Sequence, residues 1–510
     1  MPLTEREIRT IVDRITAELG RGGGAAIPSA GAAPSAAAVG VPSGPPVPTP
    51  ADHAGSAATR RVSAETRPIP SGGSLGIFET VDEAAAAARA AQREIPTLEL
   101  RDRIIANQRK RLGEAAESLA EEAVAETRLG NVRSKTLKNR LVVDRTPGTE
   151  DLEPEILSGD HGLTLTELAP WGVIGAVTPS TNPAATIINN GISMIASGNA
   201  VVFGAHPLAK SVTNRTIHLM NAASAEVGGP ETLLTAVAQP SIEAAQAMFH
   251  HRGIDLLVVT GGGGVVRAAQ KSDKRVIAAG PGNPPVVVDR TADLAQTARD
   301  IVAGAGFDNN IVCTCEKEIL AEAAIADELL AELQRNDAVL LSAEEAEALA
   351  RAILTDYPGP EPRMNKDFVG KDPAVIAGLI GKRVPETTRL LVAETGKGHP
   401  FAFLELLTPV IPLIRSPDVN TAIDWAVELE HGFKHTACMH SKSLDALHRM
   451  AVAINCSIFV KNGPNLAGLG FGGEGPTAMT ISTPTGEGPT SARTFVRRRR
   501  CVLVDYFRIV

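Results

Sequence analysis

The strongest constraint on the fold is a regular alternation of short apolar runs with helix-compatible stretches, which starts near residue 171. The runs GVIGAV, AVVF and DLLVV each lead through a loop into a stretch that is compatible with a helix. Strands that alternate with helices in this way predict a parallel, doubly wound sheet. A second series of apolar runs, PVVV, LLVAET and VIPLI, follows residue 284. We therefore expect an α/β chain with two doubly wound units.

Composition narrows the choice of partners. The 510 residues carry a net charge of −8, with 44% hydrophobic and 21% charged residues. An acidic chain does not favour nucleic acid as its main partner. No apolar run approaches the roughly 20 residues that a membrane-spanning helix needs, so we expect no membrane insertion. The five cysteines form no CxxC pair, and a structural metal is therefore not expected.

Residues 1–20 and 21–70 differ sharply from the rest of the chain. Ile8, Ile11, Val12, Ile15 and Leu19 recur at steps of three and four, which places them on one face of an amphipathic helix. Ala, Gly, Pro and Ser dominate the next segment, which predicts a flexible linker. A short amphipathic helix on a long linker is typical of a docking peptide for a protein groove. The alternative is a terminal helix that packs on the body of the protein.

Periodicity and turn residues predict helices and strands in the chain that follows the linker. Helices are expected near residues 81–93, 98–129, 208–226 and 323–354. Residues 141–168 are β-branched or alternating around a Pro-Gly pair, which predicts an extended, hairpin-like arm. The glycine-rich residues 462–489 predict a loop system that lines a cleft. The segment RRRRCVLVDYFRIV predicts a strand with a solvated or subunit-facing arginine patch.

Two cysteines lie in the run FDNNIVCTCEKE at residues 307–318. A cysteine in such a loop can be a nucleophile, because a reactive thiolate needs partial exposure and nearby dipoles. A small buried hydrophobic residue is the alternative. The run alone does not separate these two interpretations. His431, His435 and His440 lack a carboxylate at helical spacing, and they are interpreted as packing or polar loop residues.

A glycine run follows one of the predicted strands. The segment VVTGGGG leads into VVRAAQKS, which is compatible with a helix. Strand, glycines and helix in this order let a backbone approach a nucleotide phosphate. The pattern is not GxGxxG, however, and a glycine run alone is weak evidence. An ordinary turn remains the alternative.

Several motifs taken together resemble the aldehyde dehydrogenase superfamily, and more closely its CoA-acylating branch as packaged in bacterial microcompartments. They occur in the family's order: PWGVIGAVTPSTNP, GISMIASGNAVVF, VVTGGGG, FDNNIVCTCEKE, ELLTPV and GGEGPTAMTISTPTGEGPTSARTFVRRRRCVL. The resemblance covers roughly residues 73–510. The N-terminal helix and linker are similar to the packaging extension of such enzymes.

This resemblance implies a fold. It predicts two doubly wound Rossmann-like domains with an oligomerisation arm. The cofactor-binding domain would comprise residues 71–140 and 166–284, and the catalytic domain residues 285–470. Residues 141–165 and 490–510 would form the arm, through which a homo-oligomer would assemble.

The resemblance also implies roles for individual residues. It places the nucleophile on Cys313, with Cys315 as a packing residue, and the oxyanion-hole amide on Asn182. Glu405 corresponds to the glutamate that holds the nicotinamide ribose. The implied cofactor-binding positions are Thr178, Pro179, His206, Pro207, Gly261, Gly262 and Glu405. The residues themselves leave open a turn-capping role for Asn182 and a surface position for Glu405.

Two departures from the superfamily affect the expected activity. Hydrolytic members carry a glutamate base where this chain has Ala278, and no carboxylate lies between Asp273 and Asp289. A lysine near the adenosine ribose is replaced by Gly204 or Ala205, which leaves the choice between NAD and NADP undecided. Without a base, water is poorly activated, whereas a thiol acceptor brings its own nucleophile.

The expected activity is the oxidation of a short aldehyde such as propanal to its acyl-CoA. NAD is the implied cofactor and CoA the co-substrate. The resemblance further implies a bacterial cytoplasmic enzyme inside a microcompartment, with residues 1–20 bound to a shell protein. The alternatives are a hydrolytic dehydrogenase that releases the free acid and an inactive packaged subunit with a binding role.

Overall fold

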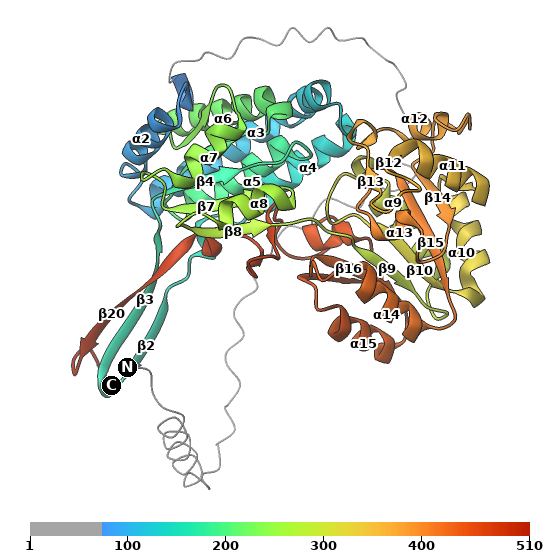
Figure 1. Ribbon diagram of the computed structural model, residues 1–510. Coiled ribbons are helices and arrows are strands. Elements are labelled where there is room, and N and C mark those ends of the chain that lie inside the picture. The colour runs from blue at the N-terminus through green and yellow to red at the C-terminus, as the bar shows by residue number, and fades with distance from the viewer. Residues whose placement is uncertain (1–73) are drawn as a thin grey trace, which may run out of the picture. The chain divides into compact units, whose positions relative to one another are not determined.

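The structure is a computed structural model that describes residues 74–510 (Figure 1). The amphipathic helix expected within residues 1–20 and the linker expected at residues 21–70 lie outside the described residues.

The first of two large sheets has six strands in the order β1-β6-β5-β4-β7-β8. Every neighbouring pair in it is parallel. Its strands are β1 (Ile77–Phe78), β4 (Val173–Val177), β5 (Ala200–Gly204), β6 (Leu234–Val237), β7 (Leu256–Thr260) and β8 (Arg275–Ala279). The alternation in the sequence therefore predicted the parallel arrangement and the strands β4, β5 and β7 correctly, because strands buried on both faces read as short, continuous apolar runs.

Helices accompany this sheet, and several of them begin with a side-chain cap. They are α2 (Val81–Gln92), α3 (Leu98–Thr127), α4 (Val132–Arg145), α5 (Pro183–Ala196), α6 (Lys210–Ala225), α7 (Ile242–His250) and α8 (Gly263–Gln270). Thr80 and Glu83 form a capping box at the start of α2. The helices expected near residues 81–93, 98–129 and 208–226 are confirmed as α2, α3 and α6.

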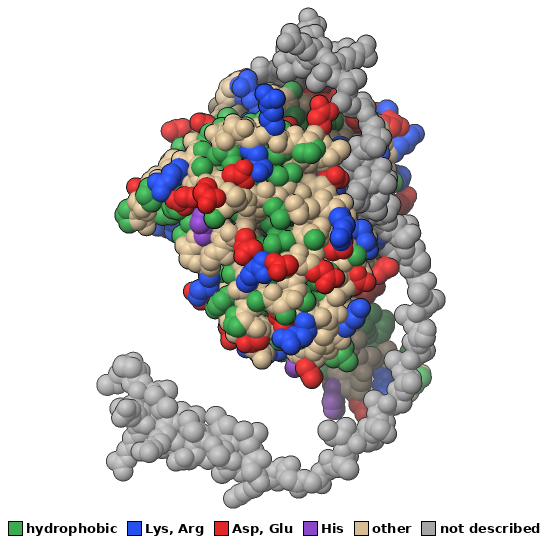
Figure 2. Space-filling model, turned by 90° about the vertical axis from the view of Figure 1, so that its right-hand side faces the viewer, with side chains coloured by type: hydrophobic (Ala, Val, Ile, Leu, Met, Phe, Trp, Pro, Cys, Tyr) green, Lys and Arg blue, Asp and Glu red, His purple; other side chains and the backbone are tan. Residues whose placement is uncertain are grey.

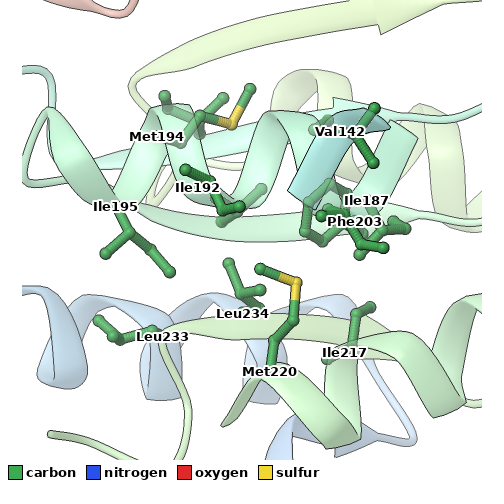
Figure 3. Close-up of a cluster of buried hydrophobic side chains, with 14 of the residues drawn as sticks. Val142, Ile187, Ile192, Met194, Ile195, Phe203, Ile217, Met220, Leu233 and Leu234 are labelled. Carbon is green, nitrogen blue, oxygen red and sulfur yellow. The ribbon is translucent and has the colours of Figure 1, made fainter. Parts of the chain in front are cut away.

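Helix α5 lies at the centre of this domain. Every one of its residues is buried, which fits a helix that is covered on all sides. Figure 3 shows Ile217 and Met220 of α6 reaching toward the side chains of α5, among them Ile192. A helix that is packed on all sides holds the end of the preceding loop in a fixed position.

The second sheet has seven strands in the order β11-β14-β15-β10-β9-β16-β17, again all parallel. Its strands are β9 (Pro285–Val288), β10 (Glu318–Glu322), β11 (Ala338–Leu341), β14 (Leu390–Glu394), β15 (Val410–Ser416), β16 (Thr436–His440) and β17 (Ile458–Lys461). Its longer helices are α9 (Leu294–Ala305), α10 (Ala323–Arg335), α11 (Ala343–Ile353), α14 (Val419–Leu429) and α15 (Leu444–Ile454). The single helical stretch expected at residues 323–354 is wrong, because β11 separates α10 from α11.

A third, antiparallel sheet contains β2 (Glu155–Gly159), β3 (Gly162–Pro170) and β20 (Val496–Val504). Figure 1 shows it extending away from the first domain. The expectation of extended structure from residue 141 onward is wrong at its start, because α4 continues to Arg145. The hairpin turn lies at residues 160–161, between β2 and β3, rather than at the Pro-Gly pair. The predicted terminal strand is confirmed as β20.

The surface carries both signs of charge. Figure 2 shows Lys and Arg side chains interspersed with Asp and Glu on the side of the molecule that lies on the right in Figure 1. None of the helices within residues 74–510 is long and apolar enough to cross a membrane. In the same part of the chain, no group of three or more His, Cys, Asp or Glu residues is arranged to hold a metal ion.

Candidate active site

One cavity of about 780 Å³ brings the predicted site residues together. Loops that follow β4, β5 and β7 form part of its wall, and the loop that contains Cys313 forms another part. In parallel sheets, loops at the carboxyl ends of the strands gather at one edge, where ligands bind. All the predicted positions line this cavity: Thr178, Pro179, Asn182, His206, Pro207, Gly261, Gly262, Cys313 and Glu405.

The loop before Cys313 has an unusual backbone. Asp308, Asn309 and Asn310 have φ angles of 48°, 54° and 64°, so that three consecutive non-glycine residues adopt the left-handed conformation. Each such residue costs about 1–2 kcal/mol, and such strain persists only where the surroundings fix it. Asn and Asp tolerate this conformation better than other residues do. The DNN triplet therefore suits this turn.

Side-chain hydrogen bonds hold this left-handed turn in place. Asp308 accepts from the backbone N–H of Asn131 at 2.8 Å. The Asn309 amide donates to the carbonyl of Gly370 at 3.0 Å and to Asp372 at 2.8 Å. The Asn310 amide donates to two carbonyls, those of Ala305 at 2.8 Å and Glu316 at 2.9 Å. The position of Cys313 thus depends on contacts that reach well beyond its own loop.

The two cysteines of this loop have different environments. Cys313 is half-buried and lines the cavity. Burial, and secondarily the charge of Glu405, raises the pKa of the Cys313 thiol to about 12, although Lys317 and Lys138 act in the opposite direction. Cys315 is buried within an apolar cluster, with its Sγ 3.9 Å from the carbonyl oxygen of Phe307. Its surroundings are those of a packing residue.

Asn182 stands at the junction between β4 and α5. It occupies the N-cap position of α5, yet its side chain makes no capping hydrogen bond. Its Nδ2 instead donates to the hydroxyl of Thr181 at 3.2 Å, and its Oδ1 accepts from the ammonium of Lys138. The turn-capping alternative for this side chain is therefore wrong. The amide is held at the cavity wall by neighbours on two sides.

The glycine run presents bare backbone to the same cavity. Gly262 is the N-cap of α8, and a Cβ atom placed on Gly262 or Gly264 would meet no heavy atom within 4 Å. The first N–H groups of a helix have no partner within the helix and point toward its N-terminal side. A phosphate group binds well at such an end. The open backbone and the free N–H groups fit the diphosphate of a dinucleotide.

Polar atoms at the cavity also lack partners. The hydroxyl of Thr178 and the Nε2 of His435 are buried without a hydrogen-bond partner within residues 74–510. Buried polar groups are usually paired, so these two atoms fit hydrogen-bonding groups of a ligand. Nδ1 of His206 accepts a hydrogen bond from the backbone N–H of Leu208 at 3.2 Å. The pKa of His206 is lowered mainly by burial and to a smaller extent by the charge of Lys366.

Glu405 is the one carboxylate among the residues that line this cavity. It is half-buried, and the backbone N–H of Gly282 donates to its Oε1 at 3.4 Å. Burial raises the pKa of its carboxyl, while Lys317 and the Gly282 N–H act against that rise. The alternative of a surface carboxylate is therefore wrong.

His435 is a wall residue that sequence reasoning assigned to packing or a polar loop. Its Nδ1 lies 2.8 Å from the hydroxyl of Thr436. Burial, with a smaller effect of Lys317, lowers its pKa to about 4. Gly282 shows how close the histidine is to the nucleophile loop: a Cβ there would lie 2.9 Å from the His435 ring and 3.1 Å from the Cys313 carbonyl oxygen. The spacing of the histidines carried no signal of this proximity.

Ala278 lies behind the cavity wall rather than in it. It is fully buried in an apolar cluster with Val259. Its neighbours Ala279 and Gly280 line the cavity. No carboxylate therefore enters the site from this part of β8.

Comparison with known proteins shows the family of this chain. Residues 74–343 match the aldehyde dehydrogenase family. The acetylating acetaldehyde dehydrogenase EutE of Escherichia coli (strain K12) is 54% identical over 439 residues, which cover 86% of this chain and 94% of the relative.

Two solved structures are similar over most of the chain. One is a propionaldehyde dehydrogenase from the fucose utilisation microcompartment of Clostridium phytofermentans, at 44% identity and a TM-score of 0.83, covering 86% of this chain and all of the other. The second is the Rhodopseudomonas palustris propionaldehyde dehydrogenase with bound CoA and an acylated cysteine, at 45% identity and a TM-score of 0.82, covering 85% and 99%. The chain thus belongs to the aldehyde dehydrogenase family and is similar over most of its length to the family's acylating members.

Proposed function

We propose that this protein oxidises a short-chain aldehyde, such as propanal, to the corresponding acyl-CoA with reduction of NAD. The observation that carries the proposal is the joint presence of Cys313, Asn182 and the open glycine run in one cavity wall. These groups supply a nucleophile, an amide donor and a backbone site for a dinucleotide. Relatives that are named acetylating acetaldehyde dehydrogenase or propionaldehyde dehydrogenase support the same activity.

In the first half-reaction, the Sγ of Cys313 attacks the aldehyde carbonyl carbon. The raised pKa keeps the thiol protonated in the resting site, so the proton must leave as the bond forms. The Nε2 of His435 has no hydrogen-bond partner within residues 74–510, and we assign the role of proton acceptor to it. The amide of Asn182 and the backbone N–H of Cys313 would stabilise the oxyanion, and one such donor typically contributes about 10²–10³ in rate. Bound NAD supplies the hydride acceptor.

In the second half-reaction, the acyl group leaves the Cys313 thioester. A general base that activates water commonly contributes about 10²–10⁴ in rate, and β8 provides no such base because Ala278 is buried in an apolar cluster. The thiol of CoA is itself a strong nucleophile, and its attack exchanges one thioester for another. The bound CoA and acylated cysteine of the Rhodopseudomonas palustris relative support this route.

Hydrolysis is the second candidate, and one observation favours it. Glu405 places a carboxylate in the cavity wall, where it could serve as a base for water. Burial raises the pKa of this carboxyl and so favours its protonated form, whereas the charge of Lys317 and the N–H of Gly282 oppose that rise. Acid release through Glu405 and transfer to CoA would give different products.

The test is a product assay with purified full-length protein, propanal and NAD, with and without CoA. We expect propanoyl-CoA as the main product and slow release of propanoic acid when CoA is omitted. Equal rates of acid release with and without CoA would favour hydrolysis instead. The Cys313→Ala variant is the control, and NADH formation that survives this substitution would contradict the thioester route.

We also propose that residues 1–20 dock the protein to a shell protein of a bacterial microcompartment, and that the β2-β3-β20 sheet joins copies of the chain. The apolar face of the predicted N-terminal helix and the origin of the Clostridium phytofermentans relative support the docking role of residues 1–20.

Exposed apolar side chains on the β2-β3-β20 sheet, among them Ile156, Leu157 and Val502, support its role in joining copies of the chain.

A further inference from the structure

Three charged side chains are buried directly behind the cavity wall. Lys135 and Lys138 of α4 have side-chain exposures of 3% and 2%, and Asp308 in the nucleophile loop has 0%. None of the three is among the residues that line the cavity. Two ammonium groups and one carboxylate leave an excess positive charge inside the protein, which is costly unless hydrogen bonds compensate it.

Their hydrogen bonds connect the two loops that carry the proposed oxyanion hole. Both lysines contact Oδ2 of Asp308, just before Cys313 in the chain. Lys135 also donates to the backbone carbonyl of Thr181 at 2.9 Å. Lys138 donates to the side-chain Oδ1 of Asn182. Helix α4 therefore bridges the loop after β4 and the loop after α9.

The contact with Lys138 determines how the Asn182 amide is oriented. An ammonium group has three donors and no acceptor, so it pairs with the amide oxygen and not with the NH₂ group. The flipped amide would bring two donor groups together and remove one of the two side-chain acceptors of the Lys138 ammonium, which would keep only Asp308. With Oδ1 held by Lys138, the NH₂ group is the end that remains for the cavity. A cation on the amide oxygen also polarises the amide and strengthens its N–H groups as donors.

We propose that Lys138 is a positioning residue for the oxyanion hole: it fixes the Asn182 amide as a donor toward the cavity and, through Asp308, couples this amide to the loop of Cys313. This inference rests on the proposed function, which assigns oxyanion stabilisation to Asn182. It adds that the donor strength of Asn182 depends on a buried cation outside the cavity.

The structure provides a matched control in Lys135. This residue lies on the same helix, is equally buried and shares the Asp308 carboxylate, but it contacts the Thr181 backbone rather than the Asn182 amide. Replacing either lysine with methionine leaves Asp308 paired with the other. Neither change therefore leaves the carboxylate as an isolated buried charge, and both variants should fold.

The experiment is a double-mutant cycle on the full-length enzyme. Initial rates of NADH formation with propanal, NAD and CoA would be measured for K138M, N182A and the double variant K138M/N182A. The same set would be repeated with K135M in place of K138M. Each ratio of kcat values is converted to a change in activation free energy. The cycle measures how far these changes depart from additivity, because residues that act through one another give non-additive effects.

We expect N182A to lower kcat by about 10²–10³ and K138M by about tenfold or more, with little change in the KM for NAD. The double variant K138M/N182A should be no more than about threefold slower than N182A alone. For K135M and N182A, the changes in activation free energy should add, so that the two fold-losses in kcat multiply. Multiplicative losses for K138M and N182A, or an unchanged kcat in K138M, would overturn the inference.

The cycle separates failure of this inference from failure of the proposed function. Only the inference fails if three results occur together. The wild-type enzyme makes propanoyl-CoA, N182A is slow, and the fold-losses in kcat of K138M and N182A multiply in the double variant. If N182A retains full activity, the proposed role of Asn182 fails. Should K138M not fold, K138Q serves in the same cycle because it keeps a neutral donor, and it should show a smaller loss than N182A. Full additivity with K138Q would equally overturn the inference.

Discussion

At the scale of single residues, the site combines a half-buried thiol with a buried imidazole. Burial raises the pKa of Cys313 to about 12 and lowers that of His435 to about 4. Both shifts favour the neutral form, because removal of water penalises charge. The resting pair is therefore a thiol and a neutral imidazole rather than a thiolate–imidazolium pair. This state protects the cysteine from oxidation, since reactivity follows the thiolate.

The pH dependence of alkylation tests this description. The thiolate fraction of a group with a pKa near 12 rises about tenfold for each pH unit below that value. We expect alkylation of Cys313 by iodoacetamide, in the absence of substrates, to accelerate about tenfold per unit between pH 7 and pH 9. Peptide mass spectrometry would follow the modification, with the exposed Cys501 as an internal reference. A plateau for Cys313 near pH 7 would show that the thiol is already ionised.

The sequence predicted many of the wall residues but missed His435. The resemblance to the family implied the roles of residues such as Thr178 and Gly261. The structure places both directly after strands of the first sheet, where the carboxyl ends of parallel strands meet at one edge. His435 reaches the wall because β16 pairs with β9, whose preceding loop contains Gly282. That pairing joins segments about 150 residues apart, and no local pattern in the sequence reveals it.

At the scale of secondary-structure elements, the left-handed turn before Cys313 depends on a neighbouring glycine. Gly130 has a φ of +68°, and a Cβ on it would lie 2.0 Å from Oδ1 of Asp308. The same residue's N–H donates to the carbonyl of Gly370 at 2.9 Å. The absence of a side chain at this position lets α4 begin close to the nucleophile loop.

Substitution of Gly130 with alanine should therefore affect both stability and catalysis. The left-handed backbone costs about 1 kcal/mol for alanine, and displacement of Asp308 adds to this. We expect Gly130→Ala to lower the free energy of unfolding by more than about 2 kcal/mol and to reduce kcat. Urea unfolding and NADH formation would measure the two effects.

Gly381→Ala is the matched control for this substitution. Gly381 has a φ of +71°, but a Cβ there meets no heavy atom within 4 Å. Its loss should be limited to about 1 kcal/mol, with kcat unchanged. Equal effects of the two substitutions would show that contact with Asp308 is unimportant.

Errors in the predicted elements have a local physical cause. Residues 141–143, LVV, favour a strand by propensity, yet they are buried at the end of α4. Tertiary packing overrides propensity in such cases. Likewise, AVLL at β11 is too short an apolar run to be distinguished from part of a buried helix.

At the scale of the whole molecule, catalysis and packaging are expected to be separate functions. The cavity is lined by residues between Val81 and Ile481, and residues 1–20 lie far from these in the sequence. Deletion of residues 1–20 should leave the kcat and the number of subunits per oligomer unchanged but abolish co-sedimentation with microcompartment shells. Enzyme assays, light scattering and shell sedimentation would measure these three properties. Shell binding that persists after the deletion would refute the docking role.

The third sheet has a consequence for the order of events during synthesis. Strand β20 pairs with β3 along its whole length, and the side chain of Arg497 donates to the carbonyl of Pro170 across 327 positions of the chain. At roughly 5–20 residues per second, β3 waits on the order of tens of seconds on the ribosome before β20 has been made. An unpaired strand edge is a site of aggregation during that interval. Completion of this sheet is therefore one of the last steps of folding, so that any assembly through it follows translation of both of the larger, parallel sheets.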